Sequence, residues 1–282
     1  MFEQITILGT GLLGASLAMA IKERGISQRT VVWSRSAGTR DRCRQADWCD
    51  LVCPEAKDAV AGSDLVVICA PVKAIVPLLN TIATSLEENV LVTDVGSTKQ
   101  NICLNAEPIL KANQTFIGSH PMAGSEQSGM LHAHAKLFES AACILTPTPG
   151  VPSEKTTRLH NFWEAMGMIT HEMSPQQHDE IVAHISHLPH LLATTLCNSL
   201  AKKSPSWATL AGGGLRDTTR IAAGDPVLWQ QILSDNRDAV LLALQGFEEE
   251  LAIIRNILGA EEDCALEDAL DTGKSYRDKL RS

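Results

Sequence analysis

The sequence lacks the features that mark several large classes of protein. Its 282 residues carry a net charge of −9 at pH 7, and this shortage of positive charge argues against a nucleic-acid partner. No apolar run approaches the roughly 18 residues of a membrane-spanning helix. The first residues show no basic segment followed by an apolar one, as a signal peptide would. The eight cysteines form no CxxC pair and have no regular spacing. We therefore expect a cytoplasmic protein with reduced, buried thiols.

What the sequence does contain is an ordinary globular composition, with 44% hydrophobic and 20% charged residues. The first motif follows a short apolar run, Ile5–Leu8, and reads Gly9-Thr10-Gly11-Leu12-Leu13-Gly14 before a helix-like stretch, Ala15–Arg24. A strand, a glycine turn and a helix in this order form a dinucleotide-binding fingerprint. In it, Gly9 permits the turn, Gly11 lets the backbone approach a pyrophosphate, and Gly14 lets the helix pack closely on the strand. The unpaired N–H groups of the helix N-terminus then face the phosphates.

The end of the next predicted strand, Thr30–Trp33, indicates which dinucleotide is bound. An NAD-binding chain usually holds Asp or Glu about 20 residues after the glycines, where the carboxylate binds the ribose 2′-hydroxyl. This chain has Ser34, Arg35 and Ser36 there. A guanidinium attracts the 2′-phosphate that a carboxylate would repel, so we predict NADP, with NAD as the alternative. An ordinary surface arginine at position 35 is the competing interpretation.

Two further apolar runs, Leu65–Cys69 and Val90–Asp94, are typical of parallel strands buried on both faces. Ligands in such sheets lie beyond the carboxyl ends of the strands. Ala70 and Pro71 after the first run, and Ser97 after the second, therefore fall at the expected mouth of the site. Ser97 is also a candidate N-cap for the next helix.

His120 follows a short apolar strand, Phe116–Gly118, and is held by Pro121. This setting suits a general acid or base, although a lone histidine is more often structural. Further strands are expected at Ala141–Thr146 and Met168–His171, with a helix between them at Thr156–Met166.

From Ser174 onward the pattern becomes helical, which places a domain boundary near residue 173 and predicts domains 1–173 and 174–282. Ser174-Pro175 and Asp225-Pro226 each combine a capping side chain with proline at the first helical position. The second pair is predicted to open one long helix through Trp229, Leu233 and Leu241. The apolar surface of the C-terminal helices exceeds what a lone helical hairpin needs, and this favours a partner subunit. The positions concerned are Leu241, Leu244, Leu251 and Ile254.

Two clusters in this helical half can carry chemistry. In the first, His187 and His190 share a helix face, with His184 and Ser186 beside them, and Pro189 should distort the helix. A metal site there lacks companion cysteines or carboxylates, so we expect no metal. In the second, Arg216 and Arg220 follow three glycines and could clamp a carboxylate. The alternative is a solvated helix face with an Asp217–Arg220 pair.

Taken together, the motifs resemble the prephenate/arogenate dehydrogenase family of tyrosine biosynthesis. The matching segments extend through nearly the whole chain: GTGLLGASLA near the start, VTDVGSTK at 92–99, GSHPMAGSEQSG at 118–129, ISHLPH at 185–190 and GGLRDTTRIAAGDPVLW at 213–229. The resemblance implies an α/β Rossmann-type domain followed by an all-α dimerisation domain, and hence a homodimer. It also implies an oxidative decarboxylation of prephenate, or of arogenate, with hydride transfer to NAD(P).

The resemblance further implies roles for individual residues. His120 matches the catalytic histidine that accepts the proton of the substrate 4-hydroxyl, and Ser97 matches the serine that binds this hydroxyl. Arg220, with Arg216 nearby, matches the arginine that holds a substrate carboxylate. The other matching positions line or support the pocket: Ser186, His187, His190, Glu126, Asp217 and Trp229. No regulatory extension or fused mutase is apparent, which disfavours tyrosine feedback through an added domain.

Two other functions are compatible with a glycine fingerprint followed by helices. Another two-domain hydroxyacid or imine dehydrogenase would typically carry a lysine or a different polar group where this chain has SHPMAG. A non-catalytic NADP-sensing regulator would not need His120, Ser97 and two arginines together.

Overall fold

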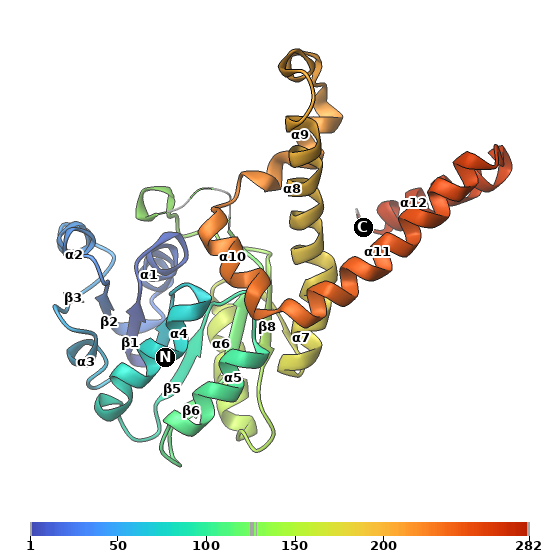
Figure 1. Cartoon of the computed structure of the whole chain (residues 1–282). Helices are drawn as coiled ribbons and strands as arrows, with labels where there is room; N and C mark the ends of the chain where they lie inside the picture. Colours follow the sequence, from blue (N-terminus) through green and yellow to red (C-terminus); the bar gives the residue numbers. More distant parts are fainter. Residues whose placement is uncertain (1, 125–126, 128, 281–282) are drawn as a thin grey trace. The chain divides into compact units, whose positions relative to one another are not determined.

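A computed structural model describes residues 2–124, 127 and 129–280 (Figure 1). The chain divides into two compact units, residues 1–236 and residues 237–282. Across the described residues, none of the helices combines the length and apolarity that crossing a membrane requires. The predicted domain boundary near residue 173 falls inside the first unit and stays a prediction.

The first unit is built on a six-stranded parallel sheet, in the order β3-β2-β1-β4-β5-β6. Its strands are β1 (Phe2–Leu8), β2 (Ser27–Trp33), β3 (Leu51–Val52), β4 (Leu65–Ile68), β5 (Leu91–Asp94) and β6 (Thr115–Phe116). Leu65–Ile68 is entirely buried, as expected for a strand covered on both faces. The order reverses beside β1, and β1 and β4 both end at the edge where dinucleotides bind in such sheets.

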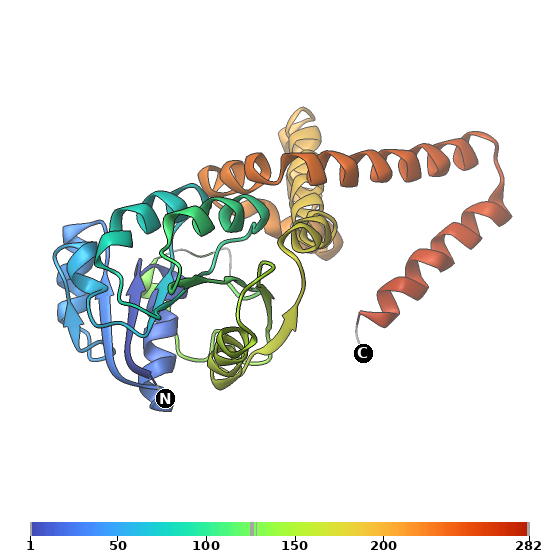
Figure 2. The ribbon, with the colours of Figure 1, turned by 90° about the horizontal axis from the view of Figure 1, so that it is seen from below.

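Helices cover both faces of this sheet. They are α1 (Leu12–Arg24), α2 (Ala37–Arg44), α3 (Ala56–Ala59), α4 (Val72–Ile82), α5 (Gln100–Ala106) and α6 (Ser153–Ala165), with short 3-10 turns at Ala83–Ser85, Glu107–Ile109 and Met130–His132. Figure 2 shows α4 and α5 on one face, and α1 and α6 on the other. Each face has its own apolar core, with Leu17, Ile21 and Trp163 in one and Ile75, Leu79 and Ile102 in the other.

A second, three-stranded sheet continues the chain after β6. Its strands are β7 (Gly118–Pro121), β8 (Ala142–Thr146) and β9 (Ile169–Glu172). His120 does follow a short strand, β6, as predicted, but it also lies within a strand of its own, β7, opposite Ile144 of the antiparallel strand β8. The chain leaves the large sheet after Phe116, and pairing with β8 then holds the backbone on both sides of His120.

The remainder of the first unit is helical. It comprises α7 (Pro175–Val182), a π-helical turn (Ala183–His187), α8 (Leu188–Ala201), a 3-10 stretch (Pro205–Leu210), α9 (Gly213–Thr219), a 3-10 turn (Arg220–Ala223) and α10 (Pro226–Asp235). Both predicted caps are confirmed: Ser174 Oγ accepts from Gln177 N at 3.1 Å, and Asp225 Oδ1 accepts from Val227 N at 2.8 Å. The distortion expected at Pro189 takes the form of the π-helical turn directly before α8.

The single long helix predicted from Asp225 through Leu241 was wrong. The helix ends at Asp235, and Asn236 has φ −103° and ψ 32°, outside the helical range. A tertiary contact accounts for the break. The Asn236 side chain is buried and donates to the Asp179 carbonyl oxygen at 2.7 Å, a hydrogen bond that local helix signals in the sequence do not reveal. α11 (Arg237–Gly259) then begins the second unit.

The second unit consists of α11 and α12 (Asp263–Lys279). Large apolar side chains stay exposed on both helices, with Leu241 57%, Leu251 52% and Leu270 65% accessible. Of the four apolar positions that the sequence analysis named, Leu241 and Leu251 are exposed, whereas Leu244 and Ile254 are half-buried. Exposed apolar surface of this kind marks an interaction site.

Candidate active site

The glycine turn between β1 and α1 has the geometry of a dinucleotide cradle. Gly9 has φ +105°, and a Cβ placed there would lie 2.1 Å from the Cys69 carbonyl oxygen. A Cβ on Gly14 would lie 1.9 Å from the Gly9 carbonyl oxygen, so only glycine lets α1 approach this closely. A Cβ on Gly11 would meet nothing described within 4 Å, which leaves room beside the backbone. No described side chain caps the first turn of α1, so its N–H groups fit a bound pyrophosphate.

Ser34, Arg35 and Ser36 follow β2 directly, at the same edge of the sheet. The Ser34 side chain is buried and faces the glycine turn, where its Oγ accepts from Thr10 N at 3.0 Å. Arg35 and Ser36 are exposed. Arg40, which the sequence analysis did not single out, donates to the Ser34 and Arg35 carbonyl oxygens at 2.6 and 3.0 Å. Arg40 thus fixes the loop that presents Arg35.

Ala70 and Pro71 follow β4, and Pro71 is the N-cap position of α4. Both lie beside the glycine turn, because the preceding Cys69 carbonyl is the group that a side chain on Gly9 would strike. Leu12 and Leu13 occupy the first turn of α1 and are half-buried. The predicted cofactor residues therefore converge on one edge of the sheet.

A chain of hydrogen bonds between buried side chains surrounds His120. His120 Nδ1 lies 2.8 Å from His178 Nε2, and His178 Nδ1 lies 2.7 Å from Asp179 Oδ1. The relative exposures of the three residues are 7%, 0% and 3%. The sequence analysis missed His178 and Asp179. Their only local signal is an adjacent His-Asp pair at the start of the helix capped by Ser174.

Asp179 also decides the role of Ser97. Its two carboxylate oxygens accept from Lys99 N at 2.7 Å and from Gln100 N at 2.9 Å, and so cap the N-terminus of α5. Lys99 occupies the N-cap position, so the alternative that Ser97 caps this helix was wrong. The reason is that a carboxylate from a distant helix satisfies these N–H groups instead. Ser97 itself is half-buried in the loop before them.

A buried ion pair lies beneath the same loop. The ammonium of Lys99 contacts the carboxylate of Asp94, and both side chains are fully inaccessible. Asp94 also accepts from Gly96 N at 2.7 Å and from Ser119 N at 3.2 Å. The pair thereby fixes the backbone before Ser97 and the residue that precedes His120. The sequence analysis missed this pair as well, although both residues lie within the VTDVGSTK segment.

The histidines at the site are held neutral. Burial lowers the pKa of His120 well below its ordinary value of 6.5, and the neighbouring His178, Lys99 and His187 add to this effect. Burial also lowers the pKa of His187, to about 4, and the pKa of His178 and His190. A neutral imidazole at His120 is the form that can accept a proton.

His187 and His190 share a helix face, as predicted, and both contact Trp229. The His190 ring stacks on the indole with centroids 3.6 Å apart and planes 8° apart, while His187 meets it edge-on at 6.3 Å. A Cβ on Gly224 would lie 2.4 Å from Trp229 Nε1, so glycine is required there. His187 Nε2 and His190 Nδ1 are buried without a hydrogen bond from the described residues, and such atoms suit a polar ligand.

The metal alternative for this cluster gains no support. Across the described residues, no three His, Cys, Asp or Glu side chains come together as metal ligands. His184 is exposed, with its Nδ1 3.0 Å from the Glu180 carbonyl oxygen, whereas His187 is buried.

The two arginines belong to an exposed segment. Arg216 lies in α9, beside α8 (Figure 1), and Arg220 begins the 3-10 turn that follows. This turn packs against α8, which carries His190, and so places Arg220 near the histidine cluster. Ser186 lies half-buried in the π-helical turn, and Asp217 is exposed on α9. Glu126 lies outside the described residues.

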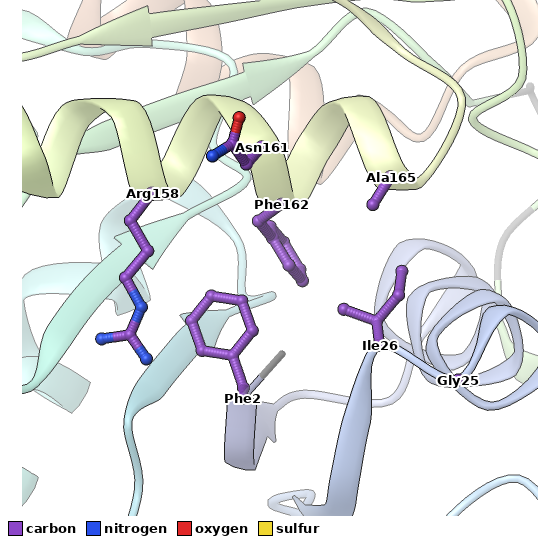
Figure 3. A pocket seen from close by; sticks show the side chains of 7 residues that line it. All are labelled: Phe2, Gly25, Ile26, Arg158, Asn161, Phe162 and Ala165. Atoms are coloured by element: carbon purple, nitrogen blue, oxygen red, sulfur yellow. The ribbon is translucent and has the colours of Figure 1, made fainter.

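A separate cavity of about 310 Å³ lies elsewhere in the first unit (Figure 3). It is lined by Phe2, Gly25, Ile26, Arg158, Asn161, Phe162 and Ala165. Phe2 begins β1 and Ile26 directly precedes β2, so this cavity is at the amino ends of the strands. Because ligands of such sheets bind at the carboxyl ends, it is not the dinucleotide site.

The doubly wound sheet, the glycine turn and the buried, neutral His120 define a dinucleotide-dependent dehydrogenase with a helical second half. Residues 17–171 match the family model of the prephenate dehydrogenase nucleotide-binding domain, and residues 174–272 match that of the prephenate dehydrogenase dimerization domain. The chain belongs to the prephenate/arogenate dehydrogenase family, and its reaction is the NAD(P)-dependent dehydrogenation that serves tyrosine biosynthesis.

Individual relatives agree with this assignment. The chain is 34% identical to the cyclohexadienyl dehydrogenase of Zymomonas mobilis, over 93% of this chain and 90% of that one. It is also 34% identical to the prephenate dehydrogenase of Bacillus subtilis, over 99% of this chain and 76% of that one. The crystal structure of A. aeolicus prephenate dehydrogenase, in complex with hydroxyphenyl propionate and NAD+, superposes with a TM-score of 0.93 at 28% identity, covering 99% of each chain. The predicted family and enzyme class are therefore confirmed, and a non-catalytic regulator is excluded.

Proposed function

We propose that His120 is the general base of an oxidative decarboxylation, acting on a cyclohexadienol that carries a ring carboxylate and a 4-hydroxyl. The substrate is prephenate, giving 4-hydroxyphenylpyruvate, or arogenate, giving tyrosine. The observation that carries the proposal is the His120 side chain, which is buried, held neutral, and bound through Nδ1 to His178. His120 Nε2 is the ring nitrogen that His178 does not engage, and it is the atom we assign to the substrate hydroxyl.

A single base is sufficient for this reaction, because the proton that it removes is returned to the product. His120 Nε2 takes the hydroxyl proton as a hydride leaves the ring carbon that bears the hydroxyl. When bound, the nicotinamide supplies the hydride acceptor. The resulting dienone breaks its bond to the ring carboxylate, releases carbon dioxide and places the electron pair on the 4-oxygen. That oxygen takes the proton back, and the aromatic product makes the step effectively irreversible.

Substrate recognition is assigned to charged and polar groups around this base. Arg220, with Arg216 nearby, holds a substrate carboxylate, because a guanidinium can bind a carboxylate through two parallel hydrogen bonds. Ser97 binds the 4-hydroxyl beside His120. The groups assigned to the substrate side chain and the pocket wall are Ser186, His187, His190 and Glu126. The buried Nε2 of His187 supports this assignment, because it has no hydrogen bond among the described residues and a buried donor needs an acceptor.

The two substrates differ only at the side chain, which is a keto acid in prephenate and an amino acid in arogenate. Relatives named for each of the two substrates match the chain. One is the prephenate dehydrogenase of Bacillus subtilis, and another is the Synechocystis arogenate dehydrogenase, known from its crystal structure. The A. aeolicus relative binds hydroxyphenyl propionate, an aromatic acid of the product type.

We further propose NADP as the preferred cofactor. Arg35 and Ser36 are exposed at the end of β2, with Arg40 fixing the loop from behind. No described side chain caps the first turn of α2, so its N–H groups also suit a phosphate. The A. aeolicus relative binds NAD+, so the preference rests on the residues of this chain.

We also propose a homodimer formed by the second domain, with residues 1–173 binding the cofactor and residues 174–282 the substrate and the partner subunit. The dimerization-domain match and the exposed apolar side chains of α11 and α12 support it. A cytoplasmic location fits the cysteines, all of which are unpaired. Half of the thiols are buried as expected, whereas the other four are partly or fully exposed: Cys49, Cys69, Cys197 and Cys264.

Steady-state kinetics with prephenate and arogenate, each crossed with NAD and NADP, test the proposed function. Reduced cofactor is followed by its absorbance, and the aromatic product by chromatography. We expect turnover with at least one of the two substrates and a lower KM for NADP. Reduction of cofactor without release of carbon dioxide would contradict the proposed reaction.

A further inference from the structure

The residues around His120 form a directed series of hydrogen bonds. Asp179 accepts from His178 Nδ1, and His178 Nε2 faces His120 Nδ1, at 2.7 and 2.8 Å. Every member is buried, so a hydrogen-bond partner within the fold is needed for each of these side chains. The series connects α7 to β7, and the His120 and His178 rings meet edge-on with centroids 5.0 Å apart.

The direction of the series is fixed at the Asp179 end. A carboxylate offers only acceptors. Its oxygens already accept from the backbone N–H groups of Lys99 and Gln100, so the carboxylate cannot turn away from His178. His178 must therefore carry its proton on Nδ1 and present a lone pair at Nε2. His120 in turn must carry its proton on Nδ1, and this leaves the lone pair at Nε2.

We infer that His178 and Asp179 are positioning residues for the reaction, which set His120 in the one neutral tautomer that accepts a proton from the substrate. This inference rests on the proposed role of His120. It assigns to Asp179 and His178 together the role that the aspartate of a serine-protease triad has toward its histidine, where the carboxylate fixes the tautomer and stabilises the imidazolium.

The same series also accommodates the charge that the reaction creates. When His120 Nε2 gains a proton, the ring becomes an imidazolium whose Nδ1–H donates to His178 Nε2. That proton can pass to His178 Nε2, and the resulting imidazolium is paired with Asp179. No bond other than N–H bonds changes, and the proton returns by the same route when the product oxygen takes it up.

The other charged and titratable groups near His120 come from several elements. Lys99 from the loop before α5 is paired with Asp94 of β5, and His187 lies in the π-helical turn. Cys143 of β8 approaches the His120 backbone. Lys99 and His187 both disfavour a positive charge on His120. Asp179, through His178, is the negative group that offsets them.

The test compares Asp179→Asn with a matched control, Asp64→Asn. Asp64 also caps two successive backbone N–H groups, those of Glu3 and Gln4 at 2.6 and 3.0 Å, at the amino end of β1. We expect Asp179→Asn to lower kcat by about 10²–10⁴-fold, with little change in KM. The acidic limb of its pH–rate profile should also move to lower pH, because the imidazolium of His120 has lost its stabilising carboxylate. Asp64→Asn should leave both kcat and the pH profile unchanged.

A second measurement does not depend on turnover. Nitrogen-15 NMR of imidazole rings reports which nitrogen carries the proton, and we expect His120 protonated on Nδ1 in the wild type. The wild-type protein could show this tautomer and yet be inactive on both substrates. That result would contradict the proposed function and leave the tautomer assignment intact. Protonation of His120 on Nε2 would overturn the inference, as would an Asp179→Asn variant with unchanged kcat and pH profile.

If Asp179→Asn fails to fold, a pair of variants at His178 tests whether His178 acts as a hydrogen-bond acceptor for His120. The amide oxygen of His178→Gln can still accept from His120 Nδ1, whereas His178→Leu offers no acceptor. We expect the glutamine variant to keep at least tenfold more kcat than the leucine variant at similar thermal stability. Equal activity of the two variants would show that His178 acts only through packing.

Discussion

The Asn236 side-chain nitrogen lies 3.1 Å from His187 Nδ1, and it also donates to the Asp179 carbonyl at 2.7 Å. An amide nitrogen is a donor, so His187 Nδ1 must accept, and the His187 proton is placed on Nε2. That Nε2 atom is buried, and no described residue forms a hydrogen bond with it. The residue that interrupts the helix before α11 thus orients a histidine of the candidate active site.

The lowered pKa of His187 predicts a dependence of stability on pH. The folded chain holds His187 neutral down to about pH 4, whereas the unfolded chain gains a proton below its ordinary pKa of 6.5. The unfolded state therefore binds more protons in this window, and the free energy of unfolding should fall as pH drops from 6.5 to 4. The contribution of His187 is roughly 3 kcal/mol. Urea denaturation should show a smaller loss in His187→Gln than in the wild type or in the exposed-site control His184→Gln. Parallel curves for all three proteins would contradict the assignment.

His120→Asn should abolish proton transfer and leave the fold in place. We expect turnover to fall by roughly two to four orders of magnitude, the usual effect of losing a positioned acid or base. The affinity for the cofactor should stay near normal, because the glycine turn is untouched. Stopped-flow kinetics and cofactor fluorescence measure the two effects separately. A variant that keeps most of its turnover would remove His120 from the mechanism.

Arg220→Ala should mainly raise the KM for the substrate. Arg220 is exposed in the single chain, so the loss of its hydrogen bonds to the charged carboxylate should cost about 1.5–3 kcal/mol. Arg216→Ala is the matched comparison on the preceding helix, and its effect should be smaller. Initial-rate measurements over a range of substrate concentrations distinguish the two arginines. An unchanged KM in Arg220→Ala would favour the solvated-face interpretation.

The apolar residues of α11 and α12 predict a dimer in solution. Leu241 and Leu251 are more than half exposed in the single chain, so replacing them should not disturb its own core. Sedimentation equilibrium at micromolar concentration should show a dimer for the wild type and a shift toward monomer for Leu241→Glu with Leu251→Glu. Leu131→Glu, at an 83% exposed position in the first unit, is the control and should stay dimeric. A monomeric wild-type protein would refute the prediction.

Ser34→Asp combined with Arg35→Ala should reverse the preference for NADP over NAD. Asp at position 34 repels the 2′-phosphate, and loss of the guanidinium removes its charge-assisted bonds. Each tenfold change in preference corresponds to about 1.4 kcal/mol. Because Ser34 Oγ accepts from Thr10 N, Arg35→Ala alone is the variant that leaves the turn intact, and it should weaken NADP binding selectively. If the wild type prefers NAD, or the double variant keeps its preference, the cofactor is selected by other residues.

Local sequence spacing was sufficient to predict many of the structural features of this protein. The glycine turn, the caps at Ser174 and Asp225 and the buried parallel strands each depend on residues within a few positions of one another. The side chain or backbone group that each feature needs is therefore already adjacent in the sequence. The motifs around His120, His187 and Arg220 also marked the family, because their order and spacing are specific.

Only the tertiary structure decided what surrounds the candidate base. His120 and His178 are 58 positions apart, and Lys99 and Asp179 are 80 apart, so no local pattern brings either pair together. The break at Asn236 has the same origin, since its side chain satisfies a backbone carbonyl 57 positions away. Burial then makes each of these hydrogen bonds obligatory, because a polar group removed from water must find its partner within the fold.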